Sequence, residues 1–311
     1  MSILPLKWFS AELNCKFLYL YRMKHLLFLP LFCFWAVTLN AQDTVSIPDS
    51  LSGWQTSWSV GISGSQASYS NWSQGGINNI AATGRTTFTS VYKMDRFSYG
   101  VLLHGRFGKT KVQNEGVRKI DDRFMLLNRF LYDLSDDSAD FKLFANLRFR
   151  TQFDDGFEYG KGEDGSDRLI SGFLAPAYFT QDAGLAWVPS ESFSVEAGLG
   201  LQQTFVKNRS LGPVFGLAPG DRFRSEAGLT FATSVKTGLS TNLSYEGTFS
   251  TFTSFNKSLK STDVFFTNTV TGKINSFMNA TVSLDFVFDD DFSTELQVAQ
   301  VLSLGIVFTL R

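Results

Sequence analysis

Apolar and polar residues alternate along most of the chain, and this period of two is typical of β-strands whose two faces meet different surroundings. Phe141 and Leu143 fall on one face of such a run, whereas Lys142 and Arg148 fall on the other. Beyond residue 53, no stretch sustains the i, i+3, i+4, i+7 spacing of apolar residues that an amphipathic helix would show. The chain is therefore predicted to be all-β from there onward.

The alternation divides into long segments, each of which could cross a membrane. A tilted transmembrane strand needs about 9–11 residues, whereas strands of globular proteins average about 5–6. Segments of this length therefore favour a membrane protein over a soluble sandwich. The predicted strands are 54–67, 78–92, 97–108, 121–133, 140–153, 173–188, 193–206, 222–235, 239–252, 262–274, 277–288 and 297–310.

The connections between these strands alternate between short and long. The short ones are 93–96, 134–139, 189–192, 236–238 and 275–276, and the longer, polar, glycine-rich ones are 68–77, 109–120, 154–172, 207–221, 253–261 and 289–296. Short turns at one rim and long loops at the other are typical of outer-membrane barrels, and an even strand number places both chain ends at the short-turn, periplasmic rim. Because hydrocarbon offers no hydrogen bonds, we expect every strand to pair with two neighbours. The predicted fold class is an all-β, transmembrane, antiparallel up-and-down β-barrel of about 12 strands.

The amino-terminal region has the features of an export signal. Met23-Lys24-His25 precedes an apolar run over 26–39, and Ala41 follows. A short basic region, an apolar core of roughly 7–15 residues and a small residue at the cut describe a secretory signal. The alternative, an uncleaved anchor, would need about 20 apolar residues. The expected organisation is a spurious extension over 1–22, a signal peptide over 23–41, a short periplasmic lead over 42–53 and the outer-membrane barrel over 54–311.

Composition agrees with export to a membrane and narrows the function classes. The chain has 32 Phe but a mean hydropathy of only -0.02, as expected for strands with one apolar and one wet face. Its 28 basic and 29 acidic residues give a net charge of -1, so no field attracts nucleic acid. Cys15 and Cys33 both precede the expected cleavage point, which leaves neither disulfide nor thiolate metal site in the processed chain. We expect the cell outer membrane of a Gram-negative bacterium as the location.

Partners follow from that location. They are outer-membrane lipid and lipopolysaccharide, the barrel-assembly machinery during biogenesis, and a small solute; no cofactor and no nucleic acid is expected. Aromatic residues near strand ends would sit at the two lipid–water boundaries, although they could instead fill a soluble core. These residues are Trp54, Trp58, Tyr92, Phe97, Tyr99, Tyr132, Trp187 and Phe193.

Projected onto a barrel, the polar positions give a charge asymmetry on the inward face. An Arg or Lys at the lipid midplane would cost about 2–4 kcal/mol, which favours the lumen. The predicted basic wall comprises Arg85, Arg106, Arg123, Arg129, Lys142, Arg148 and Arg150, and the predicted acidic wall comprises Asp182, Glu196, Glu226, Glu246 and Asp285. Two hypotheses follow. The walls either face each other across a water-filled pore for small polar or anionic solutes, or pair into salt bridges that fill a structural, non-conducting barrel.

Catalysis and metal binding have little support in the sequence. His104 is the one histidine after the expected cleavage point, and a lipid hydrolase would need a serine elbow beside it that is not evident. No catalytic residue is therefore predicted, and the protein is not expected to be an enzyme. The acidic clusters at 154–158, 163–167 and 289–291 lack EF-hand spacing, so they are interpreted as solvated loop charge rather than as metal sites.

Several motifs follow one another in a recognisable order along the chain. The first, Asn71, Trp72 and Ser73 followed by Gly75 and Gly76, is also a candidate extracellular loop motif for surface binding. The others are Arg118-Lys119-Ile120-Asp121-Asp122, Phe149-Arg150-Thr151-Gln152-Phe153, Ser171-Gly172-Phe173-Leu174-Ala175-Pro176-Ala177-Tyr178, Arg224-Ser225-Glu226-Ala227-Gly228 and Asp289-Asp290-Asp291.

On these motifs the chain resembles a family of exported proteins from Bacteroidota-type bacteria that is known as domain of unknown function 3078. The resemblance implies an outer-membrane location and a barrel fold, and it supplies no established activity. Such barrels tend to end on an aromatic residue that the insertion machinery recognises. This chain departs from that habit, because Phe308 is followed by Thr309-Leu310-Arg311.

Overall fold

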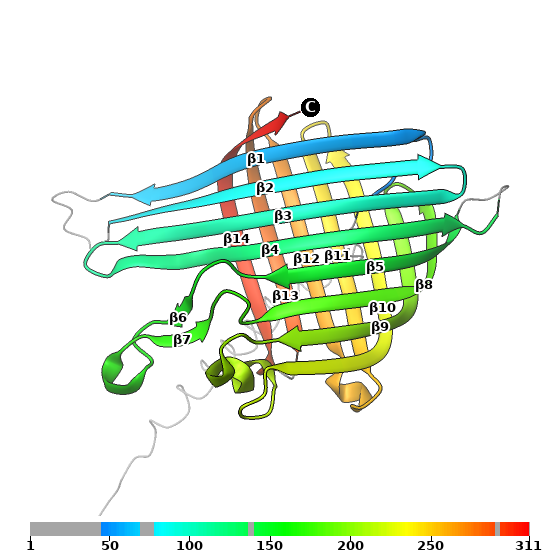
Figure 1. The fold of residues 1–311 in the computed structure, drawn as a ribbon. Coiled ribbons are helices and arrows are strands. Elements are labelled where there is room, and N and C mark those ends of the chain that lie inside the picture. Colours follow the sequence, from blue (N-terminus) through cyan, green and yellow to red (C-terminus); the bar gives the residue numbers. More distant parts are fainter. Residues whose placement is uncertain (1–44, 69–77, 136–139, 290–292, 311) are drawn as a thin grey trace, which may run out of the picture. The chain divides into compact units, whose positions relative to one another are not determined.

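The computed structural model describes residues 45–68, 78–135, 140–289 and 293–310, and its fold is shown in Figure 1. Twelve antiparallel strands form one closed barrel in which each strand pairs with the next barrel strand of the chain. The predicted fold class is confirmed. The barrel strands are β1 (Gly53–Ala67), β2 (Asn79–Met94), β3 (Phe97–Val112), β4 (Gly116–Asp133), β5 (Phe141–Thr151), β8 (Ala177–Ser190), β9 (Phe193–Phe205), β10 (Phe223–Ser240), β11 (Leu243–Ser254), β12 (Asp263–Lys273), β13 (Met278–Asp289) and β14 (Ser293–Leu310).

No helix among the described residues has the length and apolar character needed to span a bilayer.

The prediction of a long loop over 109–120 is wrong. β3 and β4 instead continue as a hairpin to a tight turn, at which Asn114 and Gly116 adopt positive φ angles of 68° and 84°. Gly and Asn accept this conformation at little steric cost, which allows the chain to reverse within a few residues. The register shifts beside Lys109, so Ile120 is left as a bulge.

Three of the other predicted long connections, 154–172, 207–221 and 253–261, carry short elements of their own. Between β5 and β8, β6 (Gly156–Glu158) pairs with β7 (Arg168–Ser171) as a separate two-stranded sheet. Short 3-10 helices also lie at this rim: η1 (Glu163–Gly165), η2 (Arg209–Phe215) and η3 (Leu259–Ser261). The η2 segment is anchored by a small apolar cluster of Ala175, Val206, Leu211, Phe215 and Leu217. The long-loop rim is therefore partly ordered by local packing.

The two faces of the barrel wall differ in chemistry. On β5, the side chains of Phe141 and Leu143 are 54% and 47% exposed, whereas the intervening Lys142 and the following Asn146 are buried. Side chains of a strand alternate between faces, so one face presents apolar groups outward and the other is enclosed by the barrel. We call the face that carries Lys142 and Asn146 the enclosed face. The ladder pairing assigns the corresponding positions on every other strand.

Aromatic side chains gather on the outer face at the short-turn rim. The Trp54 ring lies 4.9 Å from Tyr92 and 6.2 Å from Tyr99, and Trp187 lies 5.7 Å from Phe193. Each of these residues is near a strand end. Such a girdle suits the boundary between hydrocarbon and water, where an amphipathic ring is most stable.

The chain in front of β1 packs against the enclosed face. We call residues 45–51 the inner segment. Val45 is 4% exposed and forms a cluster with Val91, Leu102, Met125 and Leu127, against which Ile47 and Leu51 also pack. A Cβ atom at Gly100 would lie 2.5 Å from Val45 Cγ1, so a larger residue there would displace the segment. The short-turn end of the lumen is thus filled by the protein's own chain.

The seam at which the barrel closes is short. β1 and β14 pair only from Trp58 opposite Leu310 to Ser63 opposite Gly305, although both strands are much longer. Figure 1 shows β14, in red, running at a steep angle to β1, in blue. Among the described residues, 293–304 of β14 have no ladder partner on the β1 side. Every strand thus has two neighbours, as expected, but β1 and β14 pair over only part of their lengths.

Candidate functional site: the enclosed face

Three arginines lie side by side on the enclosed face. The ladder places Arg85 of β2 opposite Arg106 of β3, and Arg106 opposite Arg123 of β4. We call these three residues the arginine row. Like charges directly opposite one another on neighbouring strands repel, so the row has an electrostatic cost that a bound anion would offset. Arg106 Nε lies 3.2 Å from Asp121 Oδ2, which offsets part of this repulsion.

The basic surface continues onto β5. Arg148 and Arg150 share the enclosed face with Lys142, and Arg150 pairs with Met125, the residue two positions after Arg123. The Arg150 guanidinium lies 4.7 Å from the centre of the Tyr178 ring, a cation–π contact that holds it in place. Four neighbouring strands therefore contribute guanidinium groups toward the long-loop half of the lumen.

Arg129 of the predicted basic wall is neutralised by residues of the predicted acidic wall. Its Nη2 lies 2.5 Å from Glu196 Oε1, and its Nη1 donates to Asn146 Oδ1 at 3.1 Å. Asn146 Nδ2 in turn donates to Asp182 Oδ2 at 2.8 Å. These residues lie on β4, β5, β8 and β9, so the two predicted walls meet along one stretch of the sheet. Here the structure favours the salt-bridge hypothesis over a pore with opposed walls.

Lys142, also predicted for the basic wall, belongs to a four-charge cluster that holds the inner segment. Lys142 Nζ lies 2.7 Å from Asp133 Oδ1 and 3.0 Å from Asp49 Oδ1. Lys93 Nζ lies 2.9 Å from the same Asp49 oxygen and 3.0 Å from Asp133 Oδ2. Burial raises the pKa of the Asp49 carboxyl, but the hydrogen bonds and charges of Lys93 and Lys142 outweigh it, so this pKa lies below its usual range. Asp49 is thus held as a carboxylate at neutral pH.

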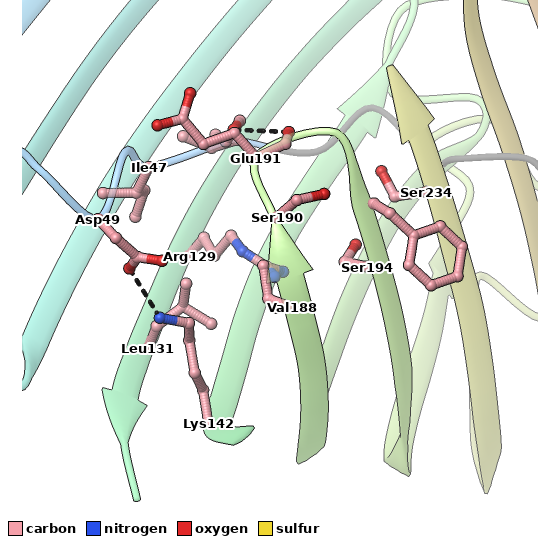
Figure 2. A pocket seen from close by; sticks show the side chains of 13 residues that line it. Ile47, Asp49, Arg129, Leu131, Lys142, Val188, Ser190, Glu191, Ser194 and Ser234 are labelled. Carbon is pink, nitrogen blue, oxygen red and sulfur yellow. Dashed lines mark hydrogen bonds and ion pairs between the residues drawn. The ribbon is translucent and has the colours of Figure 1, made fainter. Parts of the chain in front are cut away.

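A small cavity of about 40 Å³ remains beside this cluster, between the inner segment and the wall. Figure 2 shows Ile47 and Asp49 of the inner segment opposite Arg129, Leu131 and Lys142. A water molecule needs about 10–15 Å³ of such space, so the cavity has room for a few waters and for no larger solute. This cavity therefore has no room for a solute larger than water.

The remaining predicted acidic residues lie apart from the arginine row. Glu226 of β10 is buried and lies 3.1 Å from Arg224 Nε and 3.4 Å from Lys257 Nζ. Glu246 of β11 lies 2.5 Å from Lys236 Nζ, with both side chains largely exposed. Asp285 of β13 occupies an enclosed-face position opposite Thr267 and Ala299. Glu226 and Glu246 are thus paired locally instead of facing the basic wall.

Other candidate positions have these placements. His104 lies on the enclosed face of β3, two residues before Arg106, and its Nδ1 lies 3.2 Å from Thr87 Oγ1. Among the described residues, no group of three or more His, Cys, Asp or Glu side chains could hold a metal ion. The loop motif of Asn71, Trp72, Gly75 and Gly76 lies outside the described residues, as do residues 1–44.

The sequence analysis missed the anchoring role of Asp49, Lys93 and Asp133. Lys93 and Asp133 each close a strand beside a short turn, where a solvated rim charge is the ordinary interpretation. Asp49 lies in a seven-residue segment without strand periodicity. The signal that could have found them is the pairing of Asp133 with Lys142 across one hairpin.

The fold and the enclosed face define a transmembrane β-barrel of the outer-membrane type with a charged interior. The family model described as "Protein of unknown function (DUF3078)" matches residues 65–157, which confirms the predicted resemblance over that part of the chain. No curated protein matches the sequence.

Among solved structures, the chain is similar to the COG4313 outer membrane channel from Pseudomonas putida F1, with 11% identity, coverage of 86% of this chain and 98% of that chain, and a TM-score of 0.41. It is also similar to the translocator domain of the autotransporter NalP from Neisseria meningitidis, with 13% identity, coverage of 85% and 90%, and a TM-score of 0.34. The corresponding values for the NanC porin are 7% identity, 80% and 98% coverage, and a TM-score of 0.37. These likenesses are coarse, and neither a solute nor a mechanism follows from them.

Proposed function

We propose that the protein is a porin-like channel of the cell outer membrane that passes small polar or anionic solutes. The observation that carries the proposal is the arginine row, which β5 extends through Arg148 and Arg150. A ring of cationic side chains in a narrow pore concentrates anions and excludes cations.

The opposite side of the lumen fits a polar pathway. Many enclosed-face positions of β11 to β13 bear hydroxyl groups, and Glu246, Asp263 and Asp285 share this face. The hydroxyl groups offer hydrogen bonds to a solute whose charge faces the arginines. These positions include Thr248, Ser250, Thr267, Thr269, Thr281 and Ser283. The inner segment restricts the short-turn end, and conduction therefore depends on its position.

The test is the reversal potential of the refolded protein in a planar bilayer under a KCl gradient. We expect preference for chloride, and Arg148→Glu/Arg150→Glu should shift the reversal potential toward that of a cation-selective pore. Lys161→Glu/Lys260→Glu makes the same change in net charge in the long connections outside the barrel strands, and it should leave selectivity nearly unchanged. Equal reversal potentials for wild type and the Arg148/Arg150 variant would contradict the assignment of these arginines to a conducting lumen.

A second function, a non-conducting structural barrel, is favoured by one specific observation. Arg129, Asp182, Glu196 and the Asp49–Lys93–Asp133–Lys142 cluster already satisfy one another at the short-turn end. If this packing is permanent, the folded protein should give no current at any voltage. A folded barrel can be recognised independently, because its migration on a gel changes on heating and its circular dichroism is that of a β-protein.

A further inference from the structure

The closing seam contains a cavity at the edges of two strands. Beyond the last pair, Ser63 opposite Gly305, a cavity of about 490 Å³ that is open on one side lies along the edges of β1 and β14. Its lining includes outward-facing Ile62 and Leu304 together with enclosed-face Ser63 and Gly305. Because residues of both faces contribute, the cavity passes around the strand edges instead of lying on one face. Its volume falls within the range of about 300–1,000 Å³ that is typical of small-molecule sites.

The chemistry of this cavity is mainly apolar. Ile62, Ile80, Leu304 and Ile306 are between 37% and 59% exposed and point toward the hydrocarbon side, and Met278 joins them from β13. At Leu304, which lines the cavity, the edge of β14 that faces β1 is no longer paired with β1, and backbone groups open to hydrocarbon are costly. A molecule that covers the apolar side chains and carries a polar end would stabilise both features at once.

A cation lies directly behind the seam. Arg85 is opposite Gly61 of β1, and Gly61 is opposite Val307 of β14. A Cβ atom at Gly61 would lie 3.3 Å from Arg85 Cγ and 3.0 Å from Ile306 O, so the arginine stem passes close under the paired part of the seam. Arg85 is therefore the member of the arginine row next to the seam, two ladder positions from Thr83, which lies opposite Ser63 of the cavity lining.

We propose that the seam cavity binds a single-chain amphiphile with an anionic head group, the head at Arg85 and the chain among Ile62, Ile80 and Leu304. The structure thus assigns a lateral route by which such a molecule passes between the lumen and the bilayer. This proposal deepens the proposed function and rests on it, since the same arginine row binds the solute charge. The apolar lining selects the chain, and the guanidinium selects a carboxylate over an uncharged group.

Binding is tested with the full-length protein in non-ionic detergent, with dansyl-labelled undecanoate as the probe and its methyl ester as the uncharged match. We expect saturable binding of the carboxylate and several-fold weaker binding of the ester. Arg85→Gln should reduce carboxylate affinity to that of the ester, whereas Leu304→Trp, which fills the cavity, should abolish binding of both. The matched controls are Lys236→Gln on the enclosed face of β10 and Leu199→Trp on the outer face of β9, and both should bind as wild type does.

Equal binding by all variants, or equal binding of carboxylate and ester, would mean partition into the micelle and would overturn the proposal. Selectivity in the bilayer is measured on the same proteins. If the wild-type protein shows no anion preference in the bilayer but its probe binding still depends on Arg85, only the channel proposal is contradicted. If the wild-type protein prefers anions but neither the Arg85 nor the Leu304 substitution changes probe binding, only the seam site is contradicted.

A cysteine cross-link tests the open seam without a ligand. In a Cys15→Ser/Cys33→Ser background, Ser59→Cys/Thr309→Cys joins residues that are opposite each other and should oxidise readily. Ser65→Cys/Ser303→Cys would be opposite each other only if the pairing continued past Ser63, so this pair should stay reduced. Equally rapid oxidation of both pairs would show a closed seam and overturn the proposal. Unchanged heat-dependent gel migration verifies that each variant is folded.

Discussion

Removal of residues 42–51 is expected to raise the single-channel conductance several-fold. The inner segment occupies the short-turn end, where Val45 packs into the cluster around Met125 and Asp49 binds Lys93 and Lys142. The cavity of about 40 Å³ beside this segment has room for only a few water molecules. Deleting the segment opens this end and leaves the twelve-strand ladder unchanged. Single-channel recording of the deletion variant in a planar bilayer measures the effect.

A reversible lock provides the control for this prediction. The Val45 Cβ lies 3.2 Å from the position of a Cβ at Gly100, close to the separation of about 3.5–4.5 Å in a disulfide. Val45→Cys/Gly100→Cys, in a background without Cys15 and Cys33, should therefore fix the segment and hold conductance at its lowest level. Reduction should release the segment and raise the conductance above that of the oxidised form. If deletion and lock give the same conductance, the inner segment does not limit conduction.

Arg129→Met is expected to lower the free energy of unfolding by about 3–5 kcal/mol, the usual loss when one partner of a buried ion pair is removed. Glu196 is only 5% exposed, and Arg129 is its charged partner at 2.5 Å. The variant leaves that carboxylate enclosed without its cation and also removes the donor to Asn146. Urea unfolding in detergent micelles, followed by tryptophan fluorescence, gives the difference.

Two further variants distinguish the destabilising effect of the unpaired Glu196 carboxylate from that of lost packing. Arg129→Met/Glu196→Met removes both charges and should recover most of the stability, because an apolar pair of similar volume avoids the desolvation cost. Lys236→Met breaks the pair with Glu246, in which both side chains are more than half exposed, and should cost about 0–1 kcal/mol. A loss for Arg129→Met no greater than that of Lys236→Met would show that the network contributes little.

Strand assignment was accessible to sequence reasoning because long runs of the chain alternate, β5 among them. Lys142 and Asn146 fall between Phe141, Leu143 and Leu147 in the sequence, and the enclosed and outer faces of β5 follow that alternation. The prediction failed where local turn chemistry overrides composition. Residues 109–120 are polar and glycine-containing, yet the positive φ of Asn114 and Gly116 turns them into a hairpin.

Alternation predicts the face of the barrel wall on which each charged side chain lies. It does not predict which residues lie beside that side chain on the neighbouring strands. Arg85, Arg106 and Arg123 form a row only in the register that the structure adopts, and a shift of one residue would break it. Arg129 and Glu196, predicted for the basic and the acidic wall, form a direct ion pair although they lie on the non-adjacent strands β4 and β9.

By itself, the sequence determined a barrel of long antiparallel strands with an apolar exterior and a charged interior, because period-two alternation directly encodes which side of a strand meets lipid. Only the tertiary structure decided the three features on which function depends: the docked inner segment, the arginine row and the short seam between β1 and β14. Asp49 and Lys142 are 93 residues apart, and Trp58 and Leu310 lie at opposite ends of the chain. Contacts over such separations are set by strand register and barrel closure, which no local pattern of residues specifies.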